Sequence, residues 1–427
     1  MTRAAALFTP AALLAPAALL LYLVHRRRRR RIHFDFDTII DRRGRHAVKT
    51  DLTKLVFGAH AADALPLWVA DMDLPICPHI QAAIFERAAH PIFGYTVQPA
   101  AMWAATSAWL RERHGWDVAP DAFVFSATVV SSFCNLLHLL TAPGDAVLVM
   151  TPLYAPLQAS VTGCGRRLVR HSLHRGDDDV YTIDGPGRSL EATLDDERVR
   201  LVLLCNPQNP TGRVWSEPEL ELLCSRCARR SIPIVSDEIW MDWTLFGARH
   251  TPLAPVGARC GCEVVTLGAP TKTWALAGLH SSWLAFGDAA LKARYVARYE
   301  PTSLLYGSTF ATEATLAAYT QGGPWLAAAK AYIEANLEYV IGFLAAHVPA
   351  VSPIRPQATY LLLLDCSALG LAPAELDALF VAKARILPSH GAQFGEDAAQ
   401  FQRLNCAVAR AVLEEAMRRL RAAIPTV

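Results

Sequence analysis

One lysine in an apolar setting is the first candidate for chemistry in this sequence. Lys272 follows the apolar run Val264–Leu267, which predicts a buried strand, and lies in a loop of small residues that closes on Gly278. Removal from water lowers the pKa of a lysine amine, and a neutral amine can form a Schiff base with an aldehyde. A strand-end lysine directed into water would give the same short pattern, so Lys272 needs support from other segments.

Two more strand ends carry polar side chains. The apolar run 201–204 leads into a loop with two Asn-Pro steps, whose prolines restrain the residues before them and can hold Asn209 rigidly. Another strand, 232–236, ends at Asp237. Ligands bind at the carboxyl ends of strands in open α/β sheets. An amine, a carboxylate and an amide at such ends match pyridoxal 5'-phosphate, which needs an amine for its aldehyde, an anion at its pyridine nitrogen and a donor to its phenolic oxygen.

Longer motifs resemble a known enzyme family. Besides the three strand ends, they are residues 34–44, 65–73, 90–96, 358–361 and 401–405. In this order they resemble the type I fold of the pyridoxal-phosphate-dependent aminotransferase class I/II family. More narrowly, they resemble its MalY/PatB group of cystathionine β-lyases, also called cysteine-S-conjugate β-lyases. The resemblance implies an α/β fold in which a large domain has a mainly parallel central sheet and a second, smaller domain is also α/β.

The resemblance also implies roles for individual residues. Lys272 and Asp237 are expected to be catalytic and to bind the cofactor together with Asn209. The ring of Tyr154 is expected to stack on the cofactor, although a tyrosine of this kind can also simply pack in the core. Arg403 is expected to grip the α-carboxylate of a small amino-acid substrate with two parallel hydrogen bonds.

The cofactor's phosphate is expected at a helix that opens after the strand 123–125, because backbone N–H groups and the helix dipole attract anions. A threonine at a helix start is also a common cap. Tyr95 is expected to reach the phosphate from the neighbouring subunit, which implies a homodimer with shared active sites. The other cofactor-binding candidates are Thr128, Val129, Val130, Trp240 and His280.

Four positions depart from the family pattern. Trp240 replaces a histidine or tyrosine, and an indole N–H donates a hydrogen bond but cannot exchange a proton. Ala275 replaces an asparagine, and Leu74 replaces a phenylalanine. His280 stands where many relatives have a basic phosphate ligand. None of these changes removes an essential group, so we expect an active enzyme, with room for an altered substrate range or weaker cofactor retention.

Composition narrows the class of protein. Of the 427 residues, 52% are apolar, enough for a sizeable core in one large subunit or two domains. A formal net charge of +2 implies no nucleic-acid partner. Ten scattered cysteines indicate a reducing compartment. The pairs Cys224/Cys227 and Cys260/Cys262 have spacings that zinc can use, but the first lies on a helix predicted at 217–230, so we predict no metal.

The N-terminal segment raises a separate question. Residues 4–24 are almost wholly apolar, and 26–31 are a block of arginines. The run is about long enough to span a bilayer, and the positive-inside rule would leave the enzyme in the cytoplasm, anchored to the membrane. A secretory signal would carry its charge before the apolar core. The alternative is an over-extended reading frame, because the resemblance begins only at Phe34.

Apolar strands that alternate with helical periods predict the organisation of the chain. Residues 1–33 form the apolar segment and arginine run, and 34–75 form an arm and part of the small domain. Residues 76–315 form the large, cofactor-binding domain, and 316–427 form the C-terminal small domain.

The activity implied by the resemblance is that of a C–S β-lyase. Such an enzyme cleaves cystathionine or other L-cysteine S-conjugates to a thiol, pyruvate and ammonia. An aminotransferase uses the same lysine, aspartate and arginine and is the alternative. A regulatory binding protein on the same scaffold is a further alternative, which the presence of the whole catalytic set disfavours.

Overall fold

The computed structural model describes residues 34–424, except residue 62 and residues 187–188. The apolar segment 4–24 and the arginine run lie outside these described residues. Within the described part, no helix is long and apolar enough to cross a membrane. Contact of the N-terminal segment with a membrane therefore stays a prediction. Residues from Phe36 onward form one compact unit, whose architecture follows.

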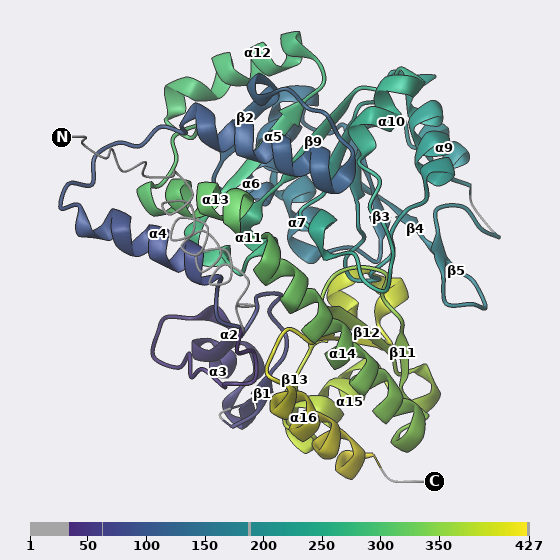
Figure 1. The fold of residues 1–427 in the computed structure, drawn as a ribbon. Coiled ribbons are helices and arrows are strands. Elements are labelled where there is room, and N and C mark those ends of the chain that lie inside the picture. Colours follow the sequence, from purple (N-terminus) through teal and green to yellow (C-terminus); the bar gives the residue numbers. More distant parts are fainter. Residues whose placement is uncertain (1–33, 62, 187–188, 425–427) are drawn as a thin grey trace, which may run out of the picture. The chain divides into compact units, whose positions relative to one another are not determined.

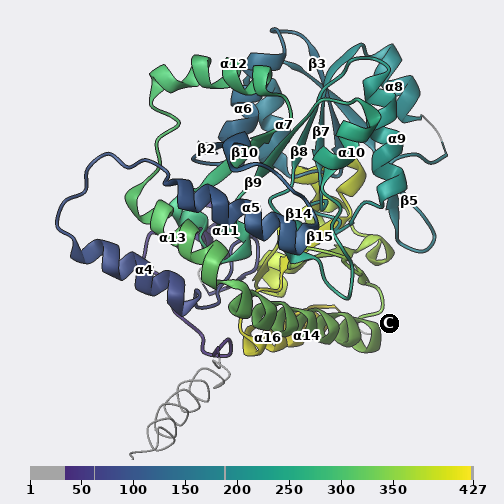
Figure 2. The same cartoon turned by 45° about the horizontal axis from the view of Figure 1, so that its top comes forward.

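A seven-stranded sheet, here called the large sheet, lies at the centre of this unit (Figure 2). Only β10 runs antiparallel to its neighbours, and the other strands run parallel to one another. The predicted α/β class with a mainly parallel central sheet is confirmed. In spatial order the strands are β2 (Phe123–Ser126), β10 (Ser282–Phe286), β9 (Val264–Gly268), β8 (Ile234–Asp237), β7 (Val199–Cys205), β3 (Ala146–Thr151) and β4 (Arg167–Ser172).

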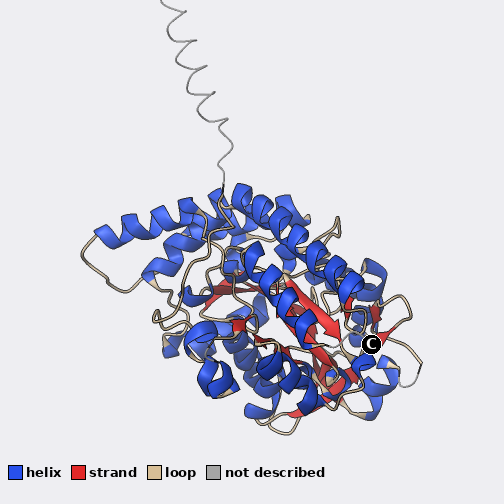
Figure 3. Cartoon of the chain, turned by 90° about the horizontal axis from the view of Figure 1, so that it is seen from below, coloured by secondary structure: helices blue, strands red, loops and turns tan. Residues whose placement is uncertain are grey.

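Helices cover both faces of the large sheet (Figure 3). Successive residues of a strand point to opposite faces, so a strand buried on both must be apolar throughout. In β3, Val147 and Val149 pack on one side, and Leu148 and Met150 on the other. The first side is covered by α6 (Val129–Leu140), α7 (Ala155–Gly163) and α12 (Ala289–Tyr299). The second is covered by α8 (Leu190–Asp196), α9 (Glu217–Ala228) and α10 (Leu253–Cys260).

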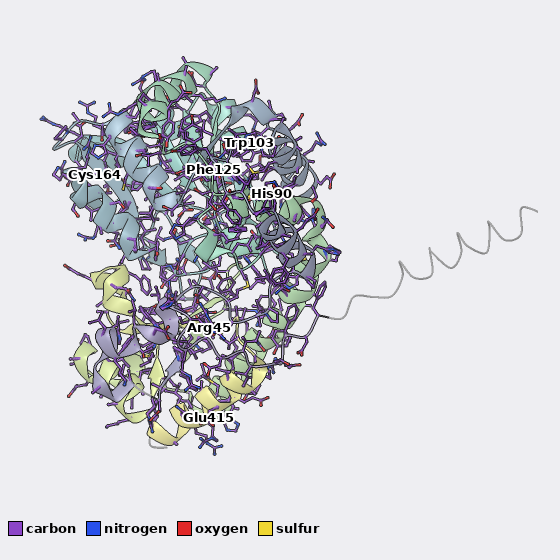
Figure 4. All side chains as sticks on the ribbon, turned by 90° about the vertical axis from the view of Figure 1, so that its left-hand side faces the viewer. Arg45, His90, Trp103, Phe125, Cys164 and Glu415 are labelled. Atoms are coloured by element: carbon purple, nitrogen blue, oxygen red, sulfur yellow. The ribbon has the colours of Figure 1, made fainter. Side chains whose placement is uncertain are left out.

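Of three further helices, α13 (Thr309–Gln321) packs against both α4 (Pro78–Ala89) and α5 (Ala100–His114), and α5 lies beside β2. Trp103 of α5 stacks on Phe123 of β2 with ring centroids 5.5 Å apart. Trp103 and Phe125 mark this part of the chain in Figure 4. Helix α13 runs through the predicted domain boundary between residues 315 and 316. The predicted domain limits stay a prediction.

A four-stranded antiparallel sheet, the small sheet, forms from C-terminal segments. Its order is β11 (Ser352–Ile354), β12 (Leu361–Asp365), β15 (Phe401–Asn405) and β14 (Ser389–His390). The long helices α14 (Gly323–His347) and α16 (Arg410–Ala423) pack beside it. The N-terminal arm joins this region because β1 (Leu65–Pro66) pairs in parallel with β13 (Ile386–Leu387). Figure 1 shows this purple arm, with α2 (Val48–Asp51) and α3 (Thr53–Phe57), beside the yellow C-terminal segments.

Gly212 ties the loop after β7 to the segment between β11 and β12 of the small sheet. Its carbonyl accepts hydrogen bonds from the N–H groups of Gln357 and Ala358, both at 2.9 Å. Its φ of 71° is left-handed, and an added Cβ would lie 2.5 Å from the Cβ of Pro356. Because glycine has no Cβ, it lets the two segments approach each other closely here.

We expect Gly212→Ala to lower the free energy of unfolding more than Gly144→Ala does. Gly144 also has a left-handed φ, of 85°, but nothing lies within 4 Å of an added Cβ there. The control should cost about 1–2 kcal/mol for backbone strain alone. Gly212→Ala should cost about 1–3 kcal/mol more through crowding. Urea unfolding measures both, and equal losses would contradict the crowding argument.

Candidate active site

The segments that carry the candidate residues leave the large sheet at one edge. The carboxyl ends of β7, β8 and β9 lead to Asn209, Asp237 and Lys272. The antiparallel strand β10 begins at this same edge, just after His280. Here the side chains surround a cavity of about 350 Å³. The predicted residues that line it are Thr128, Val129, Val130, Tyr154, Asn209, Asp237, Trp240, Lys272 and His280.

Lys272 lies in the short helix α11 (Pro270–Thr273), directly after β9. Its Nζ donates a hydrogen bond to the carbonyl of Ala70 at 2.5 Å. The indole of Trp243 donates to the Lys272 carbonyl at 2.8 Å and so holds the backbone. Removal from water lowers the pKa of Lys272 to about 8, and the charges of Asp71 and Asp237 oppose this shift. An amine in this state is a usable nucleophile and base near neutral pH.

Asp237 is buried at the end of β8. Burial raises the pKa of its carboxyl to about 7, while the backbone N–H of Ile239, 3.2 Å away, and the charge of Lys272 lower it. A buried carboxylate is costly unless a positive group faces it. Asp237 would therefore hold a proton, or a protonated nitrogen of a ligand, more readily than a solvated aspartate does.

Arg403, on β15, reaches this site from the small sheet. Its guanidinium donates to Oδ1 of Asn209 at 2.9 Å, to Oγ of Ser389 at 2.8 Å and to the carbonyl of Trp68 at 3.0 Å. Burial lowers the pKa of Arg403 to about 10. Its Nε has no hydrogen-bond partner among the described residues. The guanidinium is thus held in place while part of it stays free for an anion.

Ser389 and Trp68 escaped the sequence analysis. Trp68 lies 335 residues from Arg403 along the chain, and Ser389 comes next to it only through the pairing of β14 with β15, so no local pattern indicates that they would support it. The same holds for Ala70, Ser281 and Ser282, which also line the cavity.

Trp240 forms a wall of the cavity. Its ring packs against Tyr360 with centroids 4.8 Å apart and planes at 71°. The Lys272 ammonium lies 5.5 Å from the indole centroid, a distance at which an aromatic ring favours a cation. Nearby, Ala275 has a φ of 60°, a left-handed conformation that asparagine tolerates better than alanine. The substitution at Ala275 therefore adds backbone strain beside Lys272.

The N-terminus of α6 opens onto the same cavity. Thr128 caps the helix, since its hydroxyl accepts a hydrogen bond from the N–H of Ser131 at 3.0 Å. The first N–H groups of a helix have no partner within the helix, and those of Val129 and Val130 belong to this turn. The positive end of the helix dipole suits a phosphate. His280 lies exposed at the rim.

Tyr95 lies elsewhere. It is in the segment between α4 and α5 and its relative exposure is 104%. It borders a separate surface pocket with Phe93 and Tyr306, away from the cavity of its own chain. In the described ranges, 34–424 without residues 62, 187 and 188, no group of three or more metal-ligating side chains gathers.

Comparisons with known proteins agree with this geometry. Residues 63–420 match the family described as aminotransferase class I and II. Cystathionine beta-lyase PatB of Bacillus subtilis (strain 168) is 38% identical over 91% of this chain and 100% of its own. Protein MalY of Escherichia coli (strain K12) is 30% identical over 90% and 96% of the two chains. Cystalysin from Treponema denticola, solved with a pyridoxal 5'-phosphate cofactor, has a TM-score of 0.87 and 28% identity over 92% of this chain and 99% of its own. The chain belongs to the aminotransferase class I and II family.

Proposed function

We propose that this protein is a pyridoxal-5'-phosphate-dependent C–S β-lyase. Its substrates are cystathionine or other L-cysteine S-conjugates, and its products are a thiol, pyruvate and ammonia. The observation that carries the proposal is the meeting of Lys272, Asp237, Asn209 and the N-terminus of α6 in one cavity, with Arg403 beside it. The name of the relative PatB, a cystathionine beta-lyase, supports the same chemistry, and the structure of cystalysin contains the same cofactor.

The residues of the cavity fit this cofactor. Lys272 would hold its aldehyde and Asp237 its pyridine nitrogen, whose positive charge suits a buried carboxylate. Asn209 would face its phenolic oxygen, the ring of Tyr154 would cover a face, and the N-terminus of α6 would receive the phosphate. When bound, the cofactor supplies a ring that takes up the electron pair left on the substrate's Cα.

The protein's own groups then divide the work. Arg403 binds the α-carboxylate and so aims the Cα–H bond. Nζ of Lys272 takes the proton from Cα, which its lowered pKa of about 8 allows near neutral pH. The carboxylate of Asp237 keeps a proton on the pyridine nitrogen. The C–S bond breaks with its electron pair on sulfur, which leaves as a thiol once it gains a proton. One water is consumed overall, and the remaining carbon skeleton leaves as pyruvate and its nitrogen as ammonia.

An aminotransferase shares these groups, and substrate turnover separates the two activities. We expect sustained release of pyruvate from cystathionine in the absence of any keto acid. Lys272→Ala should lower kcat by about 10²- to 10⁴-fold, because the variant lacks the amine that takes the Cα proton. Lys292→Ala, which removes a lysine on the outer helix α12, is the matched control and should keep full activity. A reaction that stops after one turnover per site would identify an aminotransferase instead.

Asp237→Asn tests the buried carboxyl in the cofactor-free protein. Because folding raises the pKa of Asp237 from 3.8 to about 7, its contribution to stability is full below the unfolded value and is lost as the pH rises towards the folded value. Asparagine does not titrate. The variant should therefore gain stability over wild type as the pH rises from about 4.5 to about 8. Urea unfolding at both pH values measures the difference in free energy of unfolding between variant and wild type. The Asp117→Asn variant, changed at an exposed residue, is the control. A gap that does not change with pH would contradict the assignment.

We also propose that the functional unit is a symmetric dimer in which Tyr95 serves the partner's site. Tyr95 lies outside the cavity of its own chain. Around it, exposed apolar side chains form a surface of the kind that partners cover. They are Ile92, Phe93, Val97, Leu304 and Tyr306.

Mixing two impaired variants tests this dimer. Tyr95→Phe and Lys272→Ala homodimers should both be impaired, the second completely. A heterodimer has one site with both lesions and one with neither, so equal mixing should restore about a quarter of the wild-type sites. Activity after proven subunit exchange is the measurement. No recovery would place Tyr95 in its own subunit's site or outside any site.

A further inference from the structure

Two cations and two carboxylates form a closed cluster behind the Lys272 cavity. The guanidinium of Arg42 bridges Asp71 at 2.6 Å and Asp73 at 2.5 Å. The ammonium of Lys49 pairs with Asp73 at 2.7 Å and with Asp71 at 3.7 Å. The Lys49 side chain has no exposed surface. We call these four residues the arm cluster. A buried charge persists only when it is paired, and here each sign is balanced by the other.

The backbone of the same segment touches the reacting amine. The Ala70 carbonyl accepts hydrogen bonds from Nζ of Lys272 at 2.5 Å and from the hydroxyl of Tyr360 at 3.0 Å. One residue on, the Asp71 carbonyl accepts from Nδ2 of Asn405 at 2.5 Å and from Nζ of Lys49 at 3.2 Å. The arm cluster therefore holds the peptide that orients the lysine.

The negative charge of Asp71 also affects the pKa of the Lys272 amine. Removal from water lowers the pKa of Lys272, the carboxylate of Asp71 raises it most among the charges, Arg403 lowers it and Asp237 raises it. Tyr154, Cys205 and His280 are the other titratable side chains among the described residues of the cavity wall. Asp71 Oδ2 pairs with Arg42 at 2.6 Å, whereas Oδ1 makes no hydrogen bond within the described part of the chain and lies 3.7 Å from Nζ of Lys49, so part of the carboxylate's charge is left to act on the amine.

We propose that Asp71 is a positioning residue for Lys272, held by Arg42 and Lys49. Through the Ala70 carbonyl it orients the amine, and through its carboxylate it balances the amine's charge. The N-terminal arm thereby supports the reacting lysine. In Figure 4, Arg45 of this arm and Glu415 of α16 both lie in the lower part of the view. The inference rests on the proposed function only in taking Lys272 as the reacting amine.

Substitutions that remove a negative or a positive charge from the arm cluster should shift the pKa of Lys272 in opposite directions. Asp71→Asn removes a negative charge near the amine and should lower the pKa of Lys272 by about one unit. Arg42→Gln leaves Asp71 less neutralised and should raise it, by about half a unit. Arg42→Lys should bring back part of the wild-type value. A merely structural ion-pair network would instead lower stability without shifts of opposite sign.

The measurement is the pH dependence of amine labelling in the full-length chain before cofactor is added. Mass spectrometry compares the labelled fraction of Lys272 with that of the surface residue Lys292. After cofactor loading, the pH profile of kcat/KM should shift in the same directions. Arg43→Gln is the matched control, because the Arg43 side chain is 77% exposed and pairs only with its neighbour Asp41 in the described residues. It should label as wild type does.

Each outcome decides the matter. Shifts of opposite sign with an unchanged Arg43→Gln support the proposal. If the pH dependence of Lys272 labelling is unchanged in both variants, or shifts in the same direction in both, the proposal is overturned. If Asp71→Asn does not fold, the upward shift of Arg42→Gln alone supports the proposal, and its absence overturns it. Labelling shifts in a protein that releases no pyruvate would defeat the proposed function and leave this inference standing.

Discussion

The site depends on one constraint, the removal of charged groups from water at a single edge of a sheet. Lys272, Asp237 and Arg403 all have pKa values displaced towards their neutral forms by burial. Such displacement costs folding free energy, so each group must be fixed by neighbours that offset part of that cost. The surrounding structure supplies those neighbours from the large sheet, the small sheet and the arm. A ligand with a cationic nitrogen and anionic groups would offset the rest.

The pair formed by Arg403 and Asn209 shows how the two sheets are coupled. Arg403 comes from β15 of the small sheet, and Asn209 from the loop after β7 of the large sheet. The Gly212 carbonyl adds backbone hydrogen bonds between the same regions. A substrate carboxylate bound at Arg403 would therefore be held in a fixed position relative to the residues that hold the cofactor. Correct placement of both is a large part of what such a site contributes to catalysis.

The departures from the family pattern gain physical meaning in this setting. Trp240 packs against Tyr360 and lies near the Lys272 amine, so it shapes the space around that amine. Ala275 carries a left-handed backbone without the side chain best suited to it. Both changes lie within a few residues or contacts of Lys272. They alter the surroundings of the chemistry and leave its reacting groups in place.

The sequence by itself determined the strand ends. Lys272, Asp237 and Asn209 each follow an apolar run, and the carboxyl ends of parallel strands meet at one edge, so local patterns sufficed to bring them together. The helix predicted at 217–230 likewise appears, as α9 (Glu217–Ala228). These features depend on residues close together in the chain.

Only the tertiary structure decided what supports them. Trp68 holds Arg403 and Ala70 orients Lys272 through contacts that span 335 and 202 residues of the chain. Ser389 holds Arg403 from β14, the strand that pairs with β15. Arg42 and Asp71 come together because the arm packs beside the small sheet, where β1 pairs with β13. Such contacts follow from how apolar faces pack against one another, and no local spacing records that packing. For the same reason the side of the cavity that Trp240 occupies became visible only in the folded chain.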